Sequence, residues 1–291
     1  EMLQKEDEIT LFLSDETIDK FSGKKQGPKE QTSPEELPVI YEDRHILVLN
    51  KPAGMLSQKA DSREASAVEY VTGYLFEKGE LHEEELKTFH PGVCNRLDRN
   101  TSGLIVAGKS LLGLQVMSEL FKERTLKKYY LCIVKGCIKE SARIEGYLKK
   151  DEKTNRAFTE DSLSPEMKGE YRPARTDFVP LAWCQEMTLL RVHLITGRTH
   201  QIRAHLAGCG HPLLGDYKYG DKSFNEQYRK KYQIASQLLH AYELVLPENM
   251  KEPFSGLSGK VFYAPVPPVF YKVIKETVWQ HGIQEALGVL H

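Results

Sequence analysis

The segment 95–110 constrains the fold of this 291-residue chain more than any other stretch. A polar turn around Asp98 leads directly into the mostly apolar run 103–109, and Ser110 follows. A short apolar run bounded by turn residues predicts a buried strand. Ser110 is a favourable N-cap, so a helix should begin there. The apolar residues that follow it at helical spacing are Leu111, Leu114, Met117 and Phe121.

Strands and helices are expected to alternate along the rest of the chain without a regular rhythm. Two short strands should flank a polar turn at 42–44, and the further predicted strands are 127–136, 187–195 and 240–247. The predicted helices are 64–79, 199–207 and an amphipathic closing helix at 268–283. The charged segment 150–173 should leave the sheet as an excursion. This order, which contains no internal repeat, predicts an α+β fold with a mixed, largely antiparallel central sheet and flanking helices.

The N-terminal part differs in composition from the rest. Residues 1–20 are a short fragment with one predicted strand, and residues 21–37 are rich in Gly, Pro, Ser and charge, which is typical of a linker. We therefore expect one main domain at 38–291. The first residue is Glu1 rather than Met, so we expect the native N-terminus to lie upstream.

Charge and cysteine content restrict the possible partners and the compartment. The net charge is −1, so attraction to a nucleic acid must come from a local basic surface. The five cysteines are odd in number and form no CxxC pair, which favours reduced thiols in a cytoplasmic protein. No apolar run approaches the ~18 residues that a membrane-spanning helix needs.

Asp98 is a single carboxylate between two guanidinium groups, those of Arg96 and Arg99. As a turn former, its side chain would bond nearby backbone N–H groups. As a functional group, it would be an ionised carboxylate that acts as a nucleophile or base, and the neighbouring arginines would favour ionisation. The residues alone leave both possibilities open.

A second polar cluster, at 197–212, contains Arg198, His200, Arg203, His205 and His211. A metal site is disfavoured because His200 and His205 are five residues apart, about 140° around a helix. Arginines and backbone N–H groups at a helix start can bind phosphate or carboxylate. The alternative is a solvated basic helix end.

The strand at 127–136 carries two adjacent tyrosines, Tyr129 and Tyr130. Neighbouring residues of a strand face opposite sides, so only one of the two tyrosines can face a given pocket. A tyrosine in a strand usually packs in the core, and the alternative is that its ring stacks on a nucleobase. The basic residues just before them are Lys122, Arg124, Lys127 and Lys128. They form either an RNA-contacting surface or a solvated helix end.

Four stretches together resemble the RluA-type pseudouridine synthases. They are LNKPAG at 49–54, NRLDRNTSGLIV at 95–106, KKYYLCIVKG at 127–136 and GRTHQIRAHLAGCGHPLLGDYKYG at 197–220. The resemblance extends over about residues 38–275 and is greatest to the RluC-type 23S rRNA enzymes. Those enzymes carry an S4-like RNA-binding domain, and residues 1–20 resemble its last strand.

The resemblance implies isomerisation of uridine to pseudouridine in RNA, without cofactor or metal, by a monomeric enzyme. It implies a catalytic role for Asp98, paired with Arg203, and for Tyr130, which would stack on the uracil. We add the hypothesis that Tyr130 assists proton removal at C5. Arg96 would fill the place of the everted base. The substrate-binding residues predicted in this way are Arg96, Arg99, Lys51, Arg198 and His200.

The expected chemistry suits a single carboxylate. Cleavage of the bond between uracil and sugar builds positive charge on the sugar, which a carboxylate can stabilise or trap. The base is retained and rejoined, so no water needs activation, whereas a glycosidase or phosphohydrolase would require a second carboxylate or a metal. The target RNA is predicted to be 23S rRNA; a tRNA target and a non-catalytic RNA-binding homologue are the alternatives.

Two residues depart from the family pattern. Asn95 stands where the family has His, and Asn100 where it has Asp. An asparagine can still hydrogen-bond to phosphate or backbone but cannot become cationic. We therefore expect retained activity with altered handling of the substrate.

Overall fold

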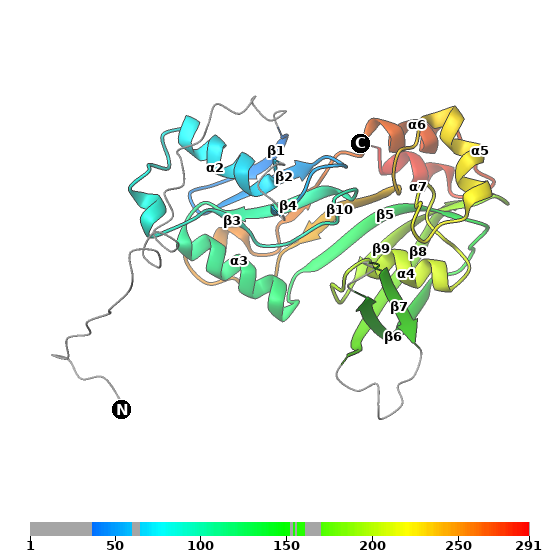
Figure 1. Ribbon diagram of the computed structural model, residues 1–291, viewed down its shortest axis with the longest axis horizontal. Helices are drawn as coiled ribbons and strands as arrows, with labels where there is room; N and C mark the ends of the chain where they lie inside the picture. Colours follow the sequence, from blue (N-terminus) through cyan, green and yellow to red (C-terminus); the bar gives the residue numbers. More distant parts are fainter. Residues whose placement is uncertain (1–36, 60–64, 152–153, 155, 161–169, 291) are drawn as a thin grey trace. The chain divides into compact units, whose positions relative to one another are not determined.

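The computed structural model describes residues 37–59, 65–151, 154, 156–160 and 170–290 (Figure 1). The chain divides into Glu1–Glu36 and Leu37–His291. The predicted S4-like remnant at 1–20 and, except for Leu37, the predicted linker at 21–37 lie outside the described residues. Within the described part, no helix has the length and apolarity needed to cross a membrane.

One sheet forms the centre of the Leu37–His291 unit. Its order is β1-β2-β4-β10-β5-β9-β8-β6-β7, with β11 beside β10 and β3 beside β4. These strands are β1 (Val39–Glu42), β2 (Ile46–Lys51), β3 (Gly92–Val93), β4 (Ser102–Gly108), β5 (Lys127–Lys135), β6 (Ala142–Asp151), β7 (Arg156–Glu160), β8 (Arg172–Trp183), β9 (Met187–Leu194), β10 (Leu239–Val245) and β11 (Val261–Tyr263). Among the described pairs of named strands, only β4 with β10 is parallel. The mixed, largely antiparallel sheet predicted from the sequence is confirmed.

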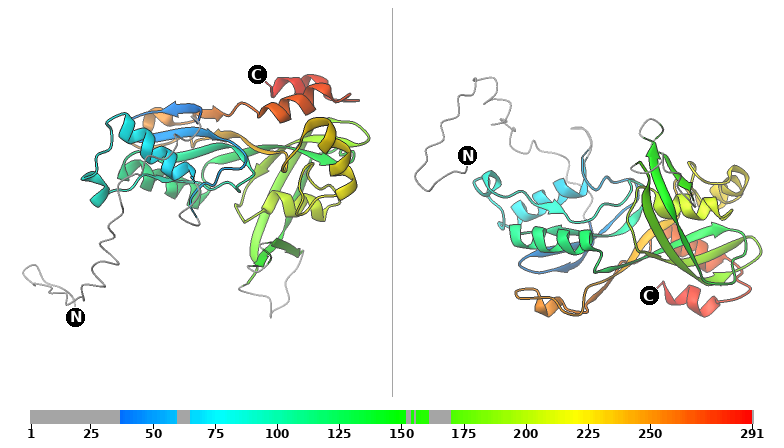
Figure 2. Two further views of the ribbon diagram at one scale, coloured as in Figure 1. Left: turned by 45° about the horizontal axis from the view of Figure 1, so that its top comes forward. Right: turned by 90° about the horizontal axis from the view of Figure 1, so that it is seen from below.

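Helices cover both faces of the sheet (Figures 1 and 2). They are α2 (Ala67–Glu77), α3 (Leu111–Glu123), α4 (Gln201–Gly208), α5 (Lys222–Tyr232), α6 (Pro268–Glu276) and α7 (Ile283–Gly288), with 3₁₀ turns at Glu85–Lys87 and Ser255–Leu257. On β4, Ile105 packs in a cluster with α2, while its neighbour Leu104 packs with Met117 of α3. Because successive strand residues face opposite sides, β4 is covered on both faces, which explains its continuous apolar run.

The turn after Asp98 enters the sheet at Gly103, where β4 meets β10. Gly103 has φ +113°, and a Cβ there would lie 2.2 Å from the carbonyl oxygen of Ala241. Alongside, the Ser102 hydroxyl lies 2.9 Å from Nδ1 of buried His240. This close contact between the parallel strands fixes the loop that carries Asp98 at the middle of the sheet.

Ser110 caps α3 as predicted, because its hydroxyl accepts the Gly113 N–H at 3.1 Å. Of the apolar residues predicted to share one side of the helix, Met117 is buried and Phe121 packs against the same core cluster, whereas Leu111 is exposed. Gly113 determines this orientation, because a Cβ at that position would lie 2.0 Å from the carbonyl oxygen of His45.

Two predicted segments differ from the structure. The closing helix predicted at 268–283 ends at Glu276, and α7 begins only at Ile283. Between them, His281 exchanges backbone hydrogen bonds with Trp183, which removes these residues from the helix. The segment 150–173 is not wholly an excursion either, because its residues 156–160 form β7, which pairs with β6 at the edge of the sheet.

Replacing Gly103 by alanine should destabilise the fold. We expect Gly103→Ala to lower the free energy of unfolding by about 3 kcal/mol or more, because of the left-handed φ and the collision with Ala241. The control is Gly73→Ala in α2, where a Cβ meets nothing within 4 Å. That change should stabilise the helix by about 0.5–1 kcal/mol. Urea denaturation followed by circular dichroism measures both, and equal effects would contradict the role assigned to Gly103.

Candidate active site

Asp98 lies on the loop that precedes β4, and its backbone is held from both sides. The Ser57 hydroxyl accepts the N–H of Leu97 and donates to the Leu97 carbonyl, both at 2.9 Å. The Thr101 N–H donates to the Asp98 carbonyl at 3.0 Å. These contacts fix the backbone, while the Asp98 side chain remains 28 % exposed. The carboxylate is therefore fixed in place but still accessible.

Arg203 of α4 connects Asp98 to a second carboxylate. Its Nη1 donates to Oδ2 of Asp98 at 3.2 Å. Its Nε and Nη2 donate to Oδ2 and Oδ1 of Asp216 at 2.7 and 3.0 Å. Asp216 is completely buried, and its Oδ1 also accepts the N–H groups of Lys218 and Tyr219. The guanidinium is thus held rigidly by Asp216 and presents its remaining edge to Asp98.

The pKa shifts of Arg203 and Asp216 favour the charged form of each residue. Burial alone would raise the pKa of Asp216, but hydrogen bonding and charge from Arg203 outweigh it, so that pKa lies below its ordinary value. Burial likewise tends to lower the pKa of Arg203, and the two carboxylates, with Asp216 the stronger, reverse the shift. Arg203 therefore stays a cation beside Asp98.

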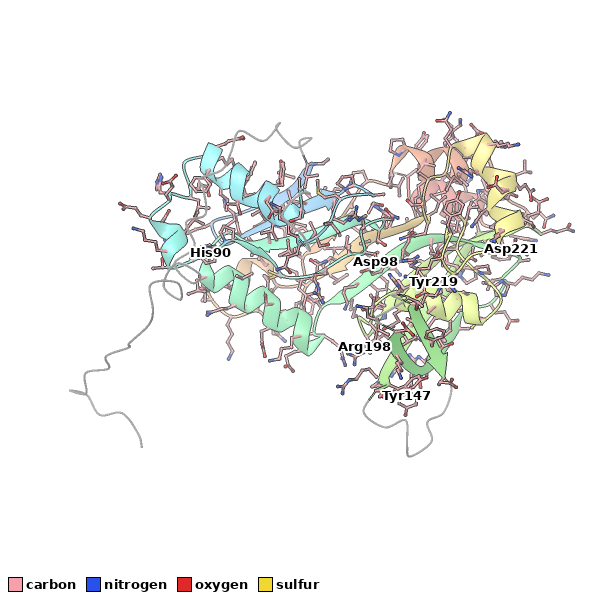
Figure 3. All side chains as sticks on the ribbon, in the orientation of Figure 1. His90, Asp98, Tyr147, Arg198, Tyr219 and Asp221 are labelled. Carbon is pink, nitrogen blue, oxygen red and sulfur yellow. The ribbon has the colours of Figure 1, made fainter. Side chains whose placement is uncertain are left out.

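His200 and Tyr219 form the next layer of the site; Figure 3 labels Tyr219 together with Asp98 and Arg198. His200 precedes α4 with φ +54°, and its Nε2 lies 3.7 Å from Oδ2 of Asp98. Its Nδ1 lies 2.9 Å from the Tyr219 hydroxyl, which accepts the Ala157 N–H of β7 at 2.6 Å. Burial lowers the pKa of His200, and Asp98 opposes that shift. A hydrogen-bonded path thus runs from β7 to a ring beside Asp98.

The two tyrosines of β5 lie on opposite faces of the sheet. Tyr130 lines the same cleft as Asp98, and burial, followed by the charge of Asp98, raises the pKa of its phenol far above its ordinary value. Tyr129 lies away from the cleft, stacked on His193 at 4.7 Å and under the Arg191 guanidinium at 3.8 Å. Tyr130, although buried, is thus the one of the two tyrosines that borders the cleft.

Asp98 and Arg203 open into a cleft of about 740 Å³. Asp98 is the one carboxylate among its described lining residues, whereas the basic lining residues are Lys59, Arg96, Lys122, Arg124, Lys128, Lys150, Arg198 and Arg203. With a net charge of only −1, the chain concentrates cations here. The cleft thus supplies the local basic surface that RNA contact requires.

Two residues predicted to bind substrate lie outside the cleft lining. Lys51 is fully buried, and its ammonium donates to the carbonyls of Pro52, Met55 and Arg99 at 3.0, 2.8 and 3.1 Å. Burial lowers its pKa to about 7, against the opposing effect of Asp98. All three N–H bonds of the Lys51 ammonium hold the loop backbone around Asp98, and substrate contact by Lys51 stays a prediction. Arg99 is exposed but is not among the cleft residues.

The other predicted site residues line the cleft. Arg96 is exposed there, and Arg198 is fixed by a hydrogen bond from its Nε to the Pro173 carbonyl at 3.2 Å. Asn95, which departs from the family pattern, binds the backbone of β4 through both amide atoms, to Leu104 and Val106. The role of Asn95 in this chain is therefore to hold the loop against β4.

Asp216 and Tyr219 were not predicted as site residues. Both belong to the stretch GDYKYG at 215–220, inside the longest family motif, so the motif match itself was the available signal. Because they are far from Asp98 along the chain, the sequence contained no sign that Arg203 would connect Asp216 to Asp98.

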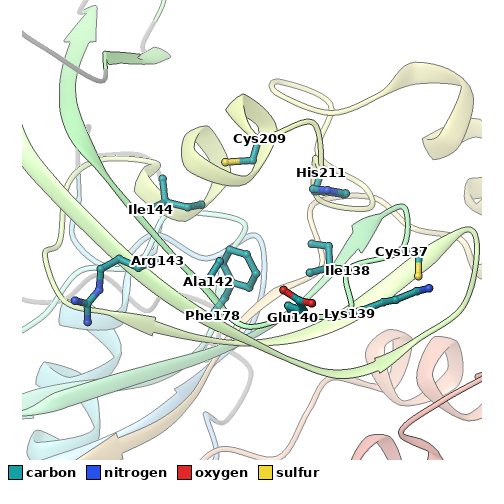
Figure 4. A pocket seen from close by; sticks show the side chains of 10 residues that line it. All are labelled: Cys137, Ile138, Lys139, Glu140, Ala142, Arg143, Ile144, Phe178, Cys209 and His211. Atoms are coloured by element: carbon teal, nitrogen blue, oxygen red, sulfur yellow. The ribbon is translucent and has the colours of Figure 1, made fainter.

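A second cavity, of about 530 Å³, shares no described lining residue with the cleft. Figure 4 shows it between the loop after β5, the start of β6 and the end of α4. Among the described residues, no group of three His, Cys, Asp or Glu side chains is arranged to hold a metal ion.

Comparisons with known proteins identify the class and then the family. The solved structure of human RNA Pseudouridylate Synthase Domain Containing 4 has a TM-score of 0.61 and 19% identity over 87% of this chain and 92% of that one, which shows the fold. Residues 45–208 match the RNA pseudouridylate synthase family model. The chain belongs to the RNA pseudouridylate synthase family. It is an isomerase of the RluA type, as its motifs predicted.

Relatives extend this likeness beyond the matched segment. Ribosomal large subunit pseudouridine synthase D of Borreliella burgdorferi is 32% identical over 239 residues, 80% of this chain and 68% of the relative. Ribosomal large subunit pseudouridine synthase C of Vibrio vulnificus is 32% identical over 205 residues, 70% of this chain and 59% of the relative. The uncharacterized RNA pseudouridine synthase YlyB of Bacillus subtilis is 30% identical, over 77% of this chain and 74% of the relative.

Removing the charge of Asp216 should weaken both the fold and the orientation of Arg203. We expect Asp216→Asn to lower the free energy of unfolding by about 3 kcal/mol at pH 7, because it leaves a buried guanidinium without its main partner. The folded-state pKa of Asp216 is depressed, so its contribution exists above its unfolded value near 3.8 and fades as the pH falls through that range.

Chemical denaturation at pH 7 and at about pH 3 measures this difference. Asp221→Asn is the matched control, because Asp221 is a surface N-cap paired with Lys135 and an asparagine still caps the helix, so the loss of stability should be small. A loss at Asp216 no larger than at Asp221 would contradict the buried pair as the support of the site.

Proposed function

We propose that the protein isomerises uridine to pseudouridine in RNA of the large ribosomal subunit, with Asp98 as the reacting carboxylate and without a cofactor. One observation carries this proposal. The carboxylate of Asp98 is held by buried Arg203 inside a cleft that otherwise presents cations. A polyanion fits such a cleft, and the carboxylate at its wall is the group able to react with it.

The cleft suits an everted nucleotide. Its volume of about 740 Å³ lies within the ~300–1,000 Å³ typical of ligand sites. A uridine inside an RNA stack cannot reach Asp98 unless it is extruded, at a cost of a few kcal/mol. Arg96 is exposed at the lining, and its guanidinium can occupy the vacated stack and offset part of that cost.

The contacts of Asp98 assign roles to its two oxygens. Among the described contacts, Arg203 and His200 both approach Oδ2, so we assign Oδ1 to the substrate. When the bond between N1 and C1′ breaks, positive charge develops on the sugar, and a carboxylate there stabilises or traps it. The detached uracil then rejoins the sugar through C5, which loses its proton, while N1, freed from the sugar, gains one, so that the reaction is a net isomerisation. Both bond partners come from the substrate and the reaction has no redox step, which is why no cofactor is invoked.

Tyr130 acts on the base rather than as a proton acceptor in this scheme. Burial and the nearby Asp98 raise the pKa of its phenol, so the phenolate is strongly disfavoured. In this scheme Tyr130 therefore stacks on the base, and its assistance to proton removal at C5 stays a prediction. An aromatic ring on the cleft wall supports the extruded uracil by stacking.

The choice of RNA rests on relatives. The named relatives from Borreliella burgdorferi and Vibrio vulnificus are ribosomal large subunit pseudouridine synthases at 32% identity. Large-subunit rRNA, specifically 23S rRNA, is the target we propose for this chain too.

Complementation tests the RNA target and Asp98 together. Large-subunit rRNA and tRNA from cells lacking the protein are treated with carbodiimide and mapped by reverse transcription. We expect one or more stops to disappear from large-subunit rRNA. The unaltered protein should restore them, whereas Asp98→Asn should not, because conversion should fall by ~10³-fold or more. Asp221→Asn is the control and should restore them.

A stop lost from tRNA instead would overturn the rRNA assignment. Restoration by Asp98→Asn would overturn the role of Asp98. Filter binding should show that Asp98→Asn retains its affinity for the rRNA, which separates loss of chemistry from loss of binding.

A further inference from the structure

Three cations gather on the wall of the cleft at the end of α3. Lys128 of β5, Arg124 at the C-cap of α3 and Arg198 before α4 all line the cleft. The ammonium of Lys128 lies over the loop beside Arg198, since a Cβ built on Gly197 would be 3.8 Å from its Nζ. Arg124 and Lys128 are four residues apart along the chain, and the fold brings Arg198 to their side.

This cluster lacks compensating charge within the described part of the chain. None of the three cations has a carboxylate within ion-pair distance there, although Lys122 nearby is paired with Glu119. Burial and the charge of Arg124 lower the pKa of Lys128 to about 8. Burial, Arg124 and Arg172 lower the pKa of Arg198. Cations kept close together at such a cost indicate a site built for an anion that is supplied by the ligand.

Strand geometry relates the cluster to the proposed uracil site. Lys128 and Tyr130 are two residues apart on β5 and share its cleft face, so their Cα atoms are about 6.7 Å apart. The ligand of the cluster is therefore a close neighbour of a base stacked on Tyr130.

We propose that Arg124, Lys128 and Arg198 form a subsite that binds a phosphodiester group of the RNA strand next to the target uridine. This placement rests on the proposed function, because the base on Tyr130 defines the target. Arginine binds phosphate through its planar fork and lysine as a point charge. The subsite holds the backbone beside the extruded nucleotide while Asp98 acts on its sugar.

The phosphate contact can be measured without any isomerisation. The probe is a fluorescent oligocytidylate of about 12 nucleotides, which contains no uridine, and its dissociation constant is measured between about 50 and 200 mM salt. We expect Lys128→Gln to weaken binding and to reduce the slope of log K against log salt by about 0.7, the value for one single-strand phosphate. Lys128→Arg should retain the slope. Lys230→Gln, the same change on exposed α5, should leave it unchanged.

A second readout uses pH. The cleft groups around Lys128 are Lys122, Arg124, Lys150 and Arg198, with Asp98 the carboxylate among the described lining residues. The ammonium of Lys128 loses its proton above about pH 8, so affinity for the probe should fall between pH 7 and about pH 9.5. Lys128→Arg should abolish most of that fall.

Kinetics on the rRNA substrate test the position next to the uridine. Lys128→Gln should raise the RNA concentration needed for half-maximal single-turnover rate several-fold and leave the maximum rate close to that of the unaltered protein. Equal slopes for Lys128→Gln and Lys230→Gln on oligocytidylate would overturn the subsite. If instead the unaltered protein converts no uridine in large-subunit rRNA, the proposed function fails and the salt and pH measurements still decide the phosphate contact.

Discussion

The buried ion pair of Arg203 with Asp216 is the interaction on which the site depends. A guanidinium and a carboxylate removed from water are costly unless both are fully hydrogen-bonded. Here Asp216 receives Arg203 and two backbone N–H groups, so the pair is well satisfied. The remaining Nη1 of Arg203 is then directed at Asp98, across 105 residues of chain. The guanidinium of Arg203 orients the Asp98 carboxylate, and Lys51 and Ser57 hold the backbone of the loop that carries Asp98.

Charge is distributed to serve a polyanionic ligand. The chain as a whole carries −1, so distant attraction to RNA is weak. The cleft lining nevertheless contains eight Lys or Arg side chains and, among its described residues, one carboxylate. The charge of Arg203 is neutralised by its two aspartates, whereas Arg124, Lys128 and Arg198 have no carboxylate partner among the described residues. In the proposed scheme binding and chemistry are separated: Arg124, Lys128 and Arg198 bind a backbone phosphate, and Asp98 with Tyr130 faces the nucleoside.

The sequence correctly predicted those elements whose formation depends on interactions between residues close together in the chain. The apolar run before Ser110 gave a buried strand and a capped helix because burial and capping involve nearby residues. The prediction of one closing helix at 268–283 was wrong because the backbone of His281 hydrogen-bonds to that of Trp183, a partner far along the chain. The family resemblance predicted Lys51 as a substrate-binding residue, yet its ammonium is bound by three backbone carbonyls. Asp216 was missed because its partner is set by the packing of α4. The family resemblance supplied the Asp98–Arg203 pair, which composition and spacing alone left open.

The most direct test is a crystal structure of the Asp98→Asn protein bound to a large-subunit rRNA fragment that contains a uridine converted by the unaltered protein. We expect that uridine to be everted into the cleft, with its C1′ against the side chain at position 98, its base on Tyr130, and Arg203 still bound to Asp216. An RNA bound with the cleft empty, or with C1′ directed away from position 98, would contradict the central claim that this carboxylate acts on the sugar.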